Sequence, residues 1–135
     1  MGRSFTLLEL IVVMIIIGVL AAIVTPQLFV AVERARASEG AAYLGIVRRA
    51  QVRYAAFNGT TAGSLSDLDI NITSLKFFTD QNIGSVNIAT DPDAIVASVQ
   101  RNAGGVYGQY YLNASANGTI VCTGATPARC ARLGF

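Results

Sequence analysis

The sequence predicts an α+β protein in which one long N-terminal helix is followed by a four-stranded antiparallel sheet packed on the C-terminal half of that helix. Three observations lead to this fold class. Residues 5–24 are almost entirely apolar, helical periodicity continues well beyond them, and short β-like runs follow Gly59. The 135 residues allow one modest domain plus one long element.

The N-terminal apolar segment carries a single charge, Glu9, between Phe5 and Val24. Twenty residues are about the length that a helix needs to cross the core of a bilayer. No small-residue cleavage site ends this segment, and Thr25-Pro26 runs directly into further helix-forming sequence, so we expect an uncleaved membrane anchor. Arg3 places the N-terminal side in the cytoplasm by the positive-inside tendency. The part after Val24 is then expected outside the cytoplasmic membrane.

The helical pattern continues after the apolar segment as a stripe of residues spaced three or four apart. This stripe consists of Tyr43, Ile46, Val47, Ala50, Tyr54 and Phe57. Asn58-Gly59 is a strong stop signal, because glycine accepts the left-handed conformation after a helix end. We therefore predict one helix from Phe5 to Phe57. Pro26 lacks a backbone donor, so a kink or a loosened stretch is expected there, with Gly18 and Gly40 as further soft points.

Short runs with β-forming residues occupy the rest of the chain. The predicted strands are Leu75–Phe78 or Ile83–Ala89 for the first, then Ala94–Gln100, Gln109–Asn113 and Thr119–Cys122. Asn117-Gly118 is the strongest hairpin signal, because both residues tolerate positive φ. Runs joined this closely form an antiparallel meander.

The composition excludes several classes of function. Apolar residues make up 53% of the chain, charged residues 13%, and the mean hydropathy is +0.50, with a net charge of +2. The absence of histidine removes imidazole metal ligands and histidine acid–base catalysis. No nucleophile motif, acid–base pair or cofactor loop is present, so no catalytic residue, cofactor or metal is expected.

The N-terminus resembles a known family. Phe5-Thr6-Leu7-Leu8-Glu9-Leu10, the apolar run to Val24 and Pro26 are similar to the signal and helix of type IV pilins and pseudopilins. In that family a prepilin peptidase cleaves before the phenylalanine and methylates the new amine. The segment Val32–Glu39 and the closing Cys122/Cys130 pair also resemble pilins. The resemblance is specific over about the first forty residues.

The resemblance implies a division of the chain and a set of roles. It implies a short cleaved leader at 1–4, a membrane and filament-core helix at 5–25 and an extracytoplasmic head domain at 26–135. The implied roles are processing and methylation at Ser4 and Phe5, assembly through Glu9 and Thr6, helix kinking or melting at Gly18 and Pro26, and a disulfide between Cys122 and Cys130. Ser4 stands where the family usually has glycine; cleavage after Gly2 is the alternative, which would move Glu9 out of register.

The function implied is that of a structural subunit, a major pilin, not an enzyme. Such a subunit would start in the bacterial inner membrane and polymerise through its N-terminal helix into an extracellular pilus for adhesion, twitching motility or DNA uptake. Its partners would be copies of itself, the prepilin peptidase and the pilus assembly machinery. A pseudopilin of a type II secretion system is the alternative, although Asp91-Pro92-Asp93-Ala94 is a poor match to the calcium-site segment of pseudopilins. A single-span membrane enzyme or receptor lacks any supporting motif.

Other polar clusters favour ordinary structural roles. Two cysteines outside the cytoplasm favour a disulfide over free thiols, and without histidine they cannot form a zinc site. The pairs Asp67/Asp69 and Asp91/Asp93 lack a calcium-loop pattern and read as turn and cap residues. The arginines at 34, 36, 48, 49 and 53 are expected to be solvated or to contact neighbouring subunits with Glu33 and Glu39, and direct nucleic-acid binding is not expected. Sequons begin at Asn58, Asn71, Asn113 and Asn117, where loop composition explains the pattern without glycosylation.

Overall fold

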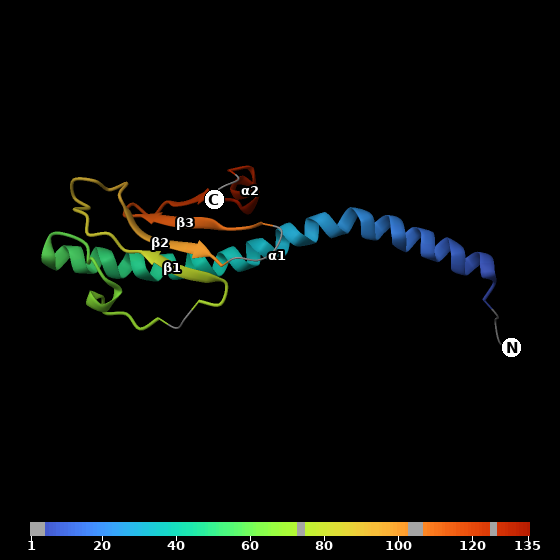
Figure 1. Cartoon of the computed structure of the whole chain (residues 1–135), viewed down its shortest axis with the longest axis horizontal. Coiled ribbons are helices and arrows are strands. Elements are labelled where there is room, and N and C mark those ends of the chain that lie inside the picture. The colour runs from blue at the N-terminus through green and yellow to red at the C-terminus, as the bar shows by residue number, and fades with distance from the viewer. Residues whose placement is uncertain (1–4, 73–74, 103–106, 125–126) are drawn as a thin grey trace. The chain divides into compact units, whose positions relative to one another are not determined.

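The predicted α+β fold is confirmed by the computed structural model, which describes residues 5–72, 75–102, 107–124 and 127–135, without the side chains of residues 82, 127 and 128. A long helix precedes a four-stranded antiparallel sheet and a short C-terminal helix (Figure 1). The elements are α1 (Leu7–Asn58), the 3₁₀ turn η1 (Leu65–Asp67), β1 (Phe78–Asn82), β2 (Ile95–Arg101), β3 (Tyr110–Ser115), β4 (Ile120–Gly124) and α2 (Pro127–Leu133). The chain divides into two compact units, Met1–Val32 and Glu33–Phe135, which we describe separately.

The ends of α1 follow the sequence signals. At its start the Thr6 hydroxyl oxygen accepts a hydrogen bond from the Glu9 backbone N–H at 3.2 Å. At its end Gly59 has φ +80° and donates to the Ala55 carbonyl at 2.8 Å, the expected stop with a left-handed glycine. The helix is continuous through Pro26. The isolated subunit therefore keeps its helix there.

The sheet is a meander in the order β1-β2-β3-β4 with every neighbouring pair antiparallel. The hairpin predicted at Asn117-Gly118 joins β3 to β4, with Ala114 opposite Ile120. Gly118 has φ +104°, whereas no described residue other than glycine has a positive φ. The Gly118 N–H donates to the Ser115 carbonyl, and the Ser115 N–H donates to the Thr119 carbonyl. This is a longer loop that ends in a left-handed glycine, not a two-residue turn with both residues at positive φ.

The buried face of α1 differs from the predicted stripe. Tyr43, Val47 and Ala50 are buried as expected, but Ile46 is 40% exposed and Phe57 is 88% exposed. The face that the sheet covers consists of Glu33, Ala37, Gly40, Tyr43, Leu44, Val47, Ala50, Gln51 and Ala55. A search for apolar spacing misses this face because it begins with a carboxylate and includes a glycine and a glutamine. Gln51 is satisfied there by both the N–H and the carbonyl of Ala62.

The first strand was predicted in the wrong place. It covers Phe78–Asn82, so it overlaps the first alternative only at Phe78, and Ile83–Ala89 is not a strand. The segment around Val86 pairs with Thr61 instead. The Thr61 N–H donates to the Val86 carbonyl, and the Val86 N–H donates to the Thr61 hydroxyl oxygen. The sequence of β1 is mostly polar and gives little strand signal, since pairing with β2 holds it in the sheet. The short helices η1 and α2 were not predicted.

Helix and sheet approach each other closely at Gly40. A Cβ built there would lie 3.1 Å from Leu112 Cδ1 and 3.2 Å from Phe78 Cζ. Such contacts are tighter than normal packing, so a side chain at this position would push β1 and β3 away from α1. Gly45, one turn further along the same helix, has no atom within 4 Å of the corresponding position.

Alanine substitutions at these two glycines should therefore have different effects on stability. Gly45→Ala should raise the free energy of unfolding by up to about 1 kcal/mol, because alanine is the better helix former. At Gly40 the same gain is opposed by roughly 1–3 kcal/mol of overpacking, so Gly40→Ala should be neutral or destabilising. Thermal unfolding of both variants in detergent micelles measures the difference. An equal gain from both would show that the contact at Gly40 is not tight.

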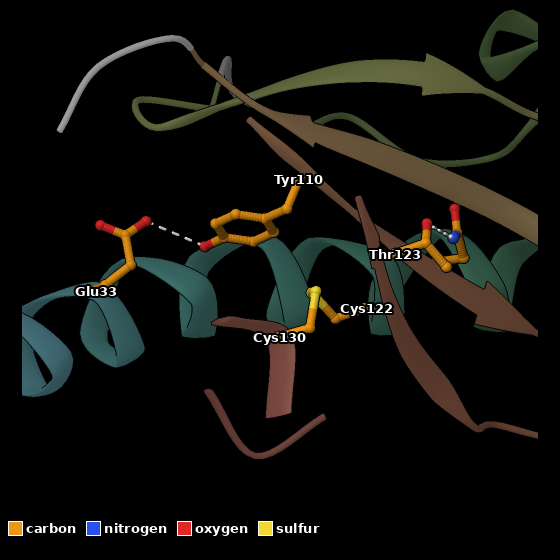
Figure 2. Close-up of a disulfide and its surroundings, with 6 residues drawn as sticks. Glu33, Tyr110, Cys122, Thr123 and Cys130 are labelled. Atoms are coloured by element: carbon orange, nitrogen blue, oxygen red, sulfur yellow. Dashed lines mark hydrogen bonds between the residues drawn. A yellow bond between two sulfur atoms is a disulfide. The ribbon is translucent and has the colours of Figure 1, made fainter. Parts of the chain in front are cut away.

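A buried ion pair joins the beginning of the head unit to the sheet. Glu33 is 3% exposed and Arg101, on β2, is 5% exposed; Arg101 Nε donates to Glu33 Oε1 at 2.6 Å. The Tyr110 hydroxyl donates to the same oxygen at 3.1 Å (Figure 2), and Arg36 donates to Oε2 at 3.1 Å. Burial acts to raise the pKa of Glu33, but the bonds and charge of Arg101, with Tyr110 and Arg36, lower it below its usual value. Burial first, and then the charge of Glu33, raises the pKa of Tyr110.

Breaking this ion pair should cost more than removing it. Glu33→Met leaves Arg101 buried and unpaired, which typically costs about 3–5 kcal/mol, whereas Glu33→Met/Arg101→Met should cost clearly less. Because folding lowers the Glu33 pKa, its contribution is present above 4.5 and is lost as pH falls through the folded value. Chemical unfolding of both variants and of the wild type as a function of pH tests this. A double variant as unstable as the single one would contradict it.

Candidate functional site

The N-terminal unit presents a predominantly apolar surface. Its large apolar side chains are exposed all round the helix. Phe5 is 78% exposed, Val12 is 45% exposed and Phe29 is 51% exposed. The helix is long and apolar enough to cross a membrane, with a mean hydropathy of 3.1 in its most apolar window and none of that window buried. A monomeric soluble protein does not present such a surface to water, because each apolar side chain left uncovered forfeits about 1.5–3 kcal/mol. This surface requires a cover of lipid or of other apolar helices.

Glu9 lies in the first turn of α1 and is exposed on this surface. No lysine or arginine occurs between Phe5 and Val32, so this stretch of the chain supplies no basic side chain to pair with it. The Thr6 hydroxyl oxygen accepts a hydrogen bond from the Glu9 backbone N–H. The spacing Thr-x-x-Glu is that of a capping box, and this pattern in the sequence would have indicated the cap.

The remaining residues of the predicted processing and melting sites are only partly described. Ser4 and the rest of the leader at 1–4 lie outside the described residues, so the cleavage position stays a prediction. Phe5 is exposed just before the first turn. Gly18 is within the helix with open space beside it. Thr25 directly precedes Pro26, and its hydroxyl donates to the Ala21 carbonyl. This bond does not replace the one that Pro26 cannot make, because the missing bond is to the Ala22 carbonyl.

Residues 3–25 match the family of the prokaryotic N-terminal methylation motif. The chain carries a type IV prepilin-like signal. The match covers the apolar segment together with Phe5 and Glu9, as the resemblance in the sequence implied. A prepilin-like signal is found on pilin-like and pseudopilin proteins, and it indicates a structural protein and an inner-membrane precursor. Comparisons with curated proteins and with solved structures gave no match.

The cysteines fix the end of the head unit. Cys122 on β4 and Cys130 on α2 lie at disulfide distance, with their Cα atoms 5.5 Å apart (Figure 2). Arg34 Nε donates to the Arg132 carbonyl at 2.9 Å, so α2 is also tied to α1. Two independent links therefore hold the C-terminal segment of the prepilin-like protein against the rest of its head.

Arg34, Arg49 and Arg53 are exposed, as expected, but most arginines of α1 also bind within their own head unit. Arg36 pairs with Glu33, Arg53 bonds to both Asp69 oxygens, and Arg48 donates to the Ala116 carbonyl under the β3–β4 turn. The second acidic residue of the segment, Glu39, is also used: its two oxygens accept from the N–H groups of Lys76 and Phe77, just before β1. The helix thereby positions the loops around the sheet.

The aspartate pairs and the sequons also have local roles. The hydrogen bond from Arg53 lowers the pKa of Asp69, and the Asp91 carboxylate accepts from the Asp93 N–H as a turn residue. Within the described residues no group of three or more histidine, cysteine, aspartate or glutamate side chains could hold a metal. Three sequon asparagines already donate hydrogen bonds from their side-chain amides. Asn58 donates to the Tyr54 carbonyl, Asn113 to the Thr123 hydroxyl and Asn117 to the Asp93 carboxylate.

Removing the disulfide should destabilise the head without preventing its folding. Cys122→Ser/Cys130→Ser releases a loop with a sequence separation of 8, which corresponds to roughly 2–3 kcal/mol in the chain-entropy model. The free energy of unfolding of the variant should fall by about that amount. Intact-mass measurement of the wild type after alkylation, with and without reductant, checks the bond directly. Two alkylated thiols in native wild-type protein would contradict it.

Proposed function

We propose that this protein is a major pilin, a subunit that polymerises through its apolar N-terminal helix into a type IV pilus. The observation that carries the proposal is the combination of the prepilin-like signal at residues 3–25 with an apolar helix surface that is exposed from residue 5 to residue 29 in the described part of the chain. The inner membrane would cover that surface in the precursor. The corresponding segments of other subunits would cover it in the filament. Both covers are apolar, so transfer from one to the other needs no exposure to water.

The Glu9 carboxylate supplies the specificity that apolar contacts lack. A charge in an apolar layer costs several kcal/mol unless it is paired or neutralised. Cleavage before Phe5 by a prepilin peptidase would create an α-amino group at the start of the helix, the nearest cation that this segment can provide. We propose that Glu9 of one subunit pairs with the Phe5 amine of another, with the Thr6 side chain beside it. A slip along the filament axis would leave both charges unpaired, so the pair fixes the axial register.

The stretch from Gly18 to Pro26 is proposed to lose regular helix when subunits pack. Gly18 is a poor helix former, and Pro26 cannot donate to the Ala22 carbonyl. The continuous helix of the isolated subunit would then be the state before assembly. Melting would let the apolar segment and the head adjust to neighbouring subunits independently.

A pseudopilin of a type II secretion system remains the second candidate, because the prepilin-like signal is common to both groups. The Cys122–Cys130 disulfide favours the pilin, since the resemblance to pilins included this pair. Uses of the pilus for adhesion, twitching motility or DNA uptake follow from the resemblance only.

Replacing Glu9 with glutamine tests the proposed assembly role. Glu9→Gln keeps the size and polarity of the side chain but removes the charge that pairs with the amine. The variant should insert in the membrane and form its disulfide normally, yet incorporate into filaments at least tenfold less than the wild type. Electron microscopy and quantification of subunits in sheared surface material, together with the mass of the mature N-terminus, give the measurement.

Gln27→Ala provides the matched control, because Gln27 is another polar side chain exposed on the same unit. It should assemble like the wild type. Wild-type amounts of filament from Glu9→Gln subunits, expressed alone, would contradict the role of the charge. Absence of filaments from wild-type cells that contain processed subunit would contradict the pilin proposal itself and favour the pseudopilin.

A further inference from the structure

The head unit contains a pocket that the assembly function does not use. Its volume is about 600 Å³, within the range of small-molecule sites. It lies between α1, the loop around η1 and the edge strand β1. The lining residues are Tyr43, Leu65, Ser66, Ile70, Asn71, Ile72, Leu75, Phe78, Thr79, Asp80 and Asn102.

Asp80 is the one charged residue among those that line the pocket. It lies on β1 opposite Val99, whose side chain is fully buried, and therefore on the face of the sheet that is turned towards α1. Its Oδ1 atom is closed to solvent and has no hydrogen-bond partner among the described residues. A carboxylate oxygen in this situation has lost its water without a replacement, which is unfavourable while the group is charged.

Tyr43, on α1, lines the same pocket as Asp80. It is 6% exposed, and burial, followed by the charge and hydrogen bonding of Asp80, raises its pKa to about 12. Burial likewise raises the pKa of Asp80, and bonds from the Tyr43 hydroxyl and the Gln81 backbone oppose this only in part. The pocket thus combines Asp80 and Tyr43 with the apolar side chains of Leu65, Ile70, Ile72, Leu75 and Phe78, and its remaining lining residues, Ser66, Asn71, Thr79 and Asn102, are polar and uncharged.

We propose that this pocket binds a small amphiphilic cation, an apolar group that ends in a primary ammonium. The ammonium would lie against the Asp80 carboxylate and the Tyr43 oxygen, and the apolar part would lie against Leu65, Ile70 and Phe78. The negative charge of a carboxylate is shared by both oxygens, so a cation bound on the pocket side also offsets the cost of the buried Oδ1.

Other ligand classes fit the pocket less well. An anion would meet Asp80 with no basic side chain among the lining residues to compensate. A metal ion would find one carboxylate where several oxygen ligands are needed. A wholly apolar molecule would make no favourable electrostatic contact with the Asp80 carboxylate, so the charge would add nothing to its affinity.

Three probes of equal chain length test the proposal: n-butylamine, n-butanol and n-butyrate. Each is titrated into the full chain in phosphatidylcholine nanodiscs, and the backbone amide shifts of Phe78, Thr79 and Ile72 are followed by NMR. Local shifts distinguish binding in the pocket from partition into the lipid. n-Butylamine should give saturable shifts at these three amides, at least tenfold tighter than n-butanol, and n-butyrate should give none.

Two variants complete the design. Asp80→Asn keeps the shape but removes the charge, and it should weaken n-butylamine at least tenfold while leaving n-butanol unchanged. Asp67→Asn removes the same charge from η1 beside the pocket, where Asp67 is exposed and not part of the lining, and it should bind like the wild type. Equal binding of amine and alcohol, unchanged amine binding in Asp80→Asn, or no saturable shift with n-butylamine would each overturn the proposal. None of these outcomes bears on filament formation, so the pilin proposal is tested separately.

Discussion

Glu33 keeps a negative charge inside the head, and much of the head is arranged around that requirement. Arg101 from β2, Tyr110 from β3 and Arg36 from the same helix all direct donors at its two oxygens. These contacts fix where two strands cross α1, and the other strands of the meander follow by pairing. Arg101 also donates to the carbonyls of Phe77 and Asn102, so one guanidinium links the helix to the residues that flank β1 and β2. Because removal of either partner would strand a buried charge, the cluster specifies a single register between helix and sheet.

The sequence predicted the architecture well because its strongest signals are local. Apolar length, the Asn58-Gly59 stop and the Asn117-Gly118 turn depend on residues close together in the chain, and α1 and the last hairpin lie where these signals placed them. The first strand was misplaced because β1 is held by its partner and not by its own propensity. For the assembly segment, Glu9 and Thr6 were recognised from a resemblance, and only the structure showed that Thr6 caps the helix. The pairing of Glu33 with Arg101 joins residues 68 positions apart, and no local pattern indicates it.

The two units meet different physical demands. Residues 5–32 of the N-terminal unit are predominantly apolar and carry one charge, so their contacts are strong but carry little positional information except at Glu9. Within the head unit, most arginines of α1 bind to partners of the same unit, and the two cysteines lie at disulfide distance from each other. Few charged side chains of α1 are therefore left to bind other molecules. A pilin built this way would take its cohesion from the apolar segment and its register from one ion pair. The head would then be free to vary on its outer surface without loss of assembly.

Gly40 places a restriction on how this head can change during evolution. The distance between α1 and the sheet is set by the missing side chain at Gly40, against which Phe78 and Leu112 are packed. These residues lie on three different elements, yet an enlargement at one has to be matched by a reduction at another. Related sequences should therefore show covariation among the three positions, with a small residue at 78 or 112 wherever position 40 carries a side chain. Substitutions at these three positions should therefore occur together during evolution, even though each residue alone resembles an ordinary core position.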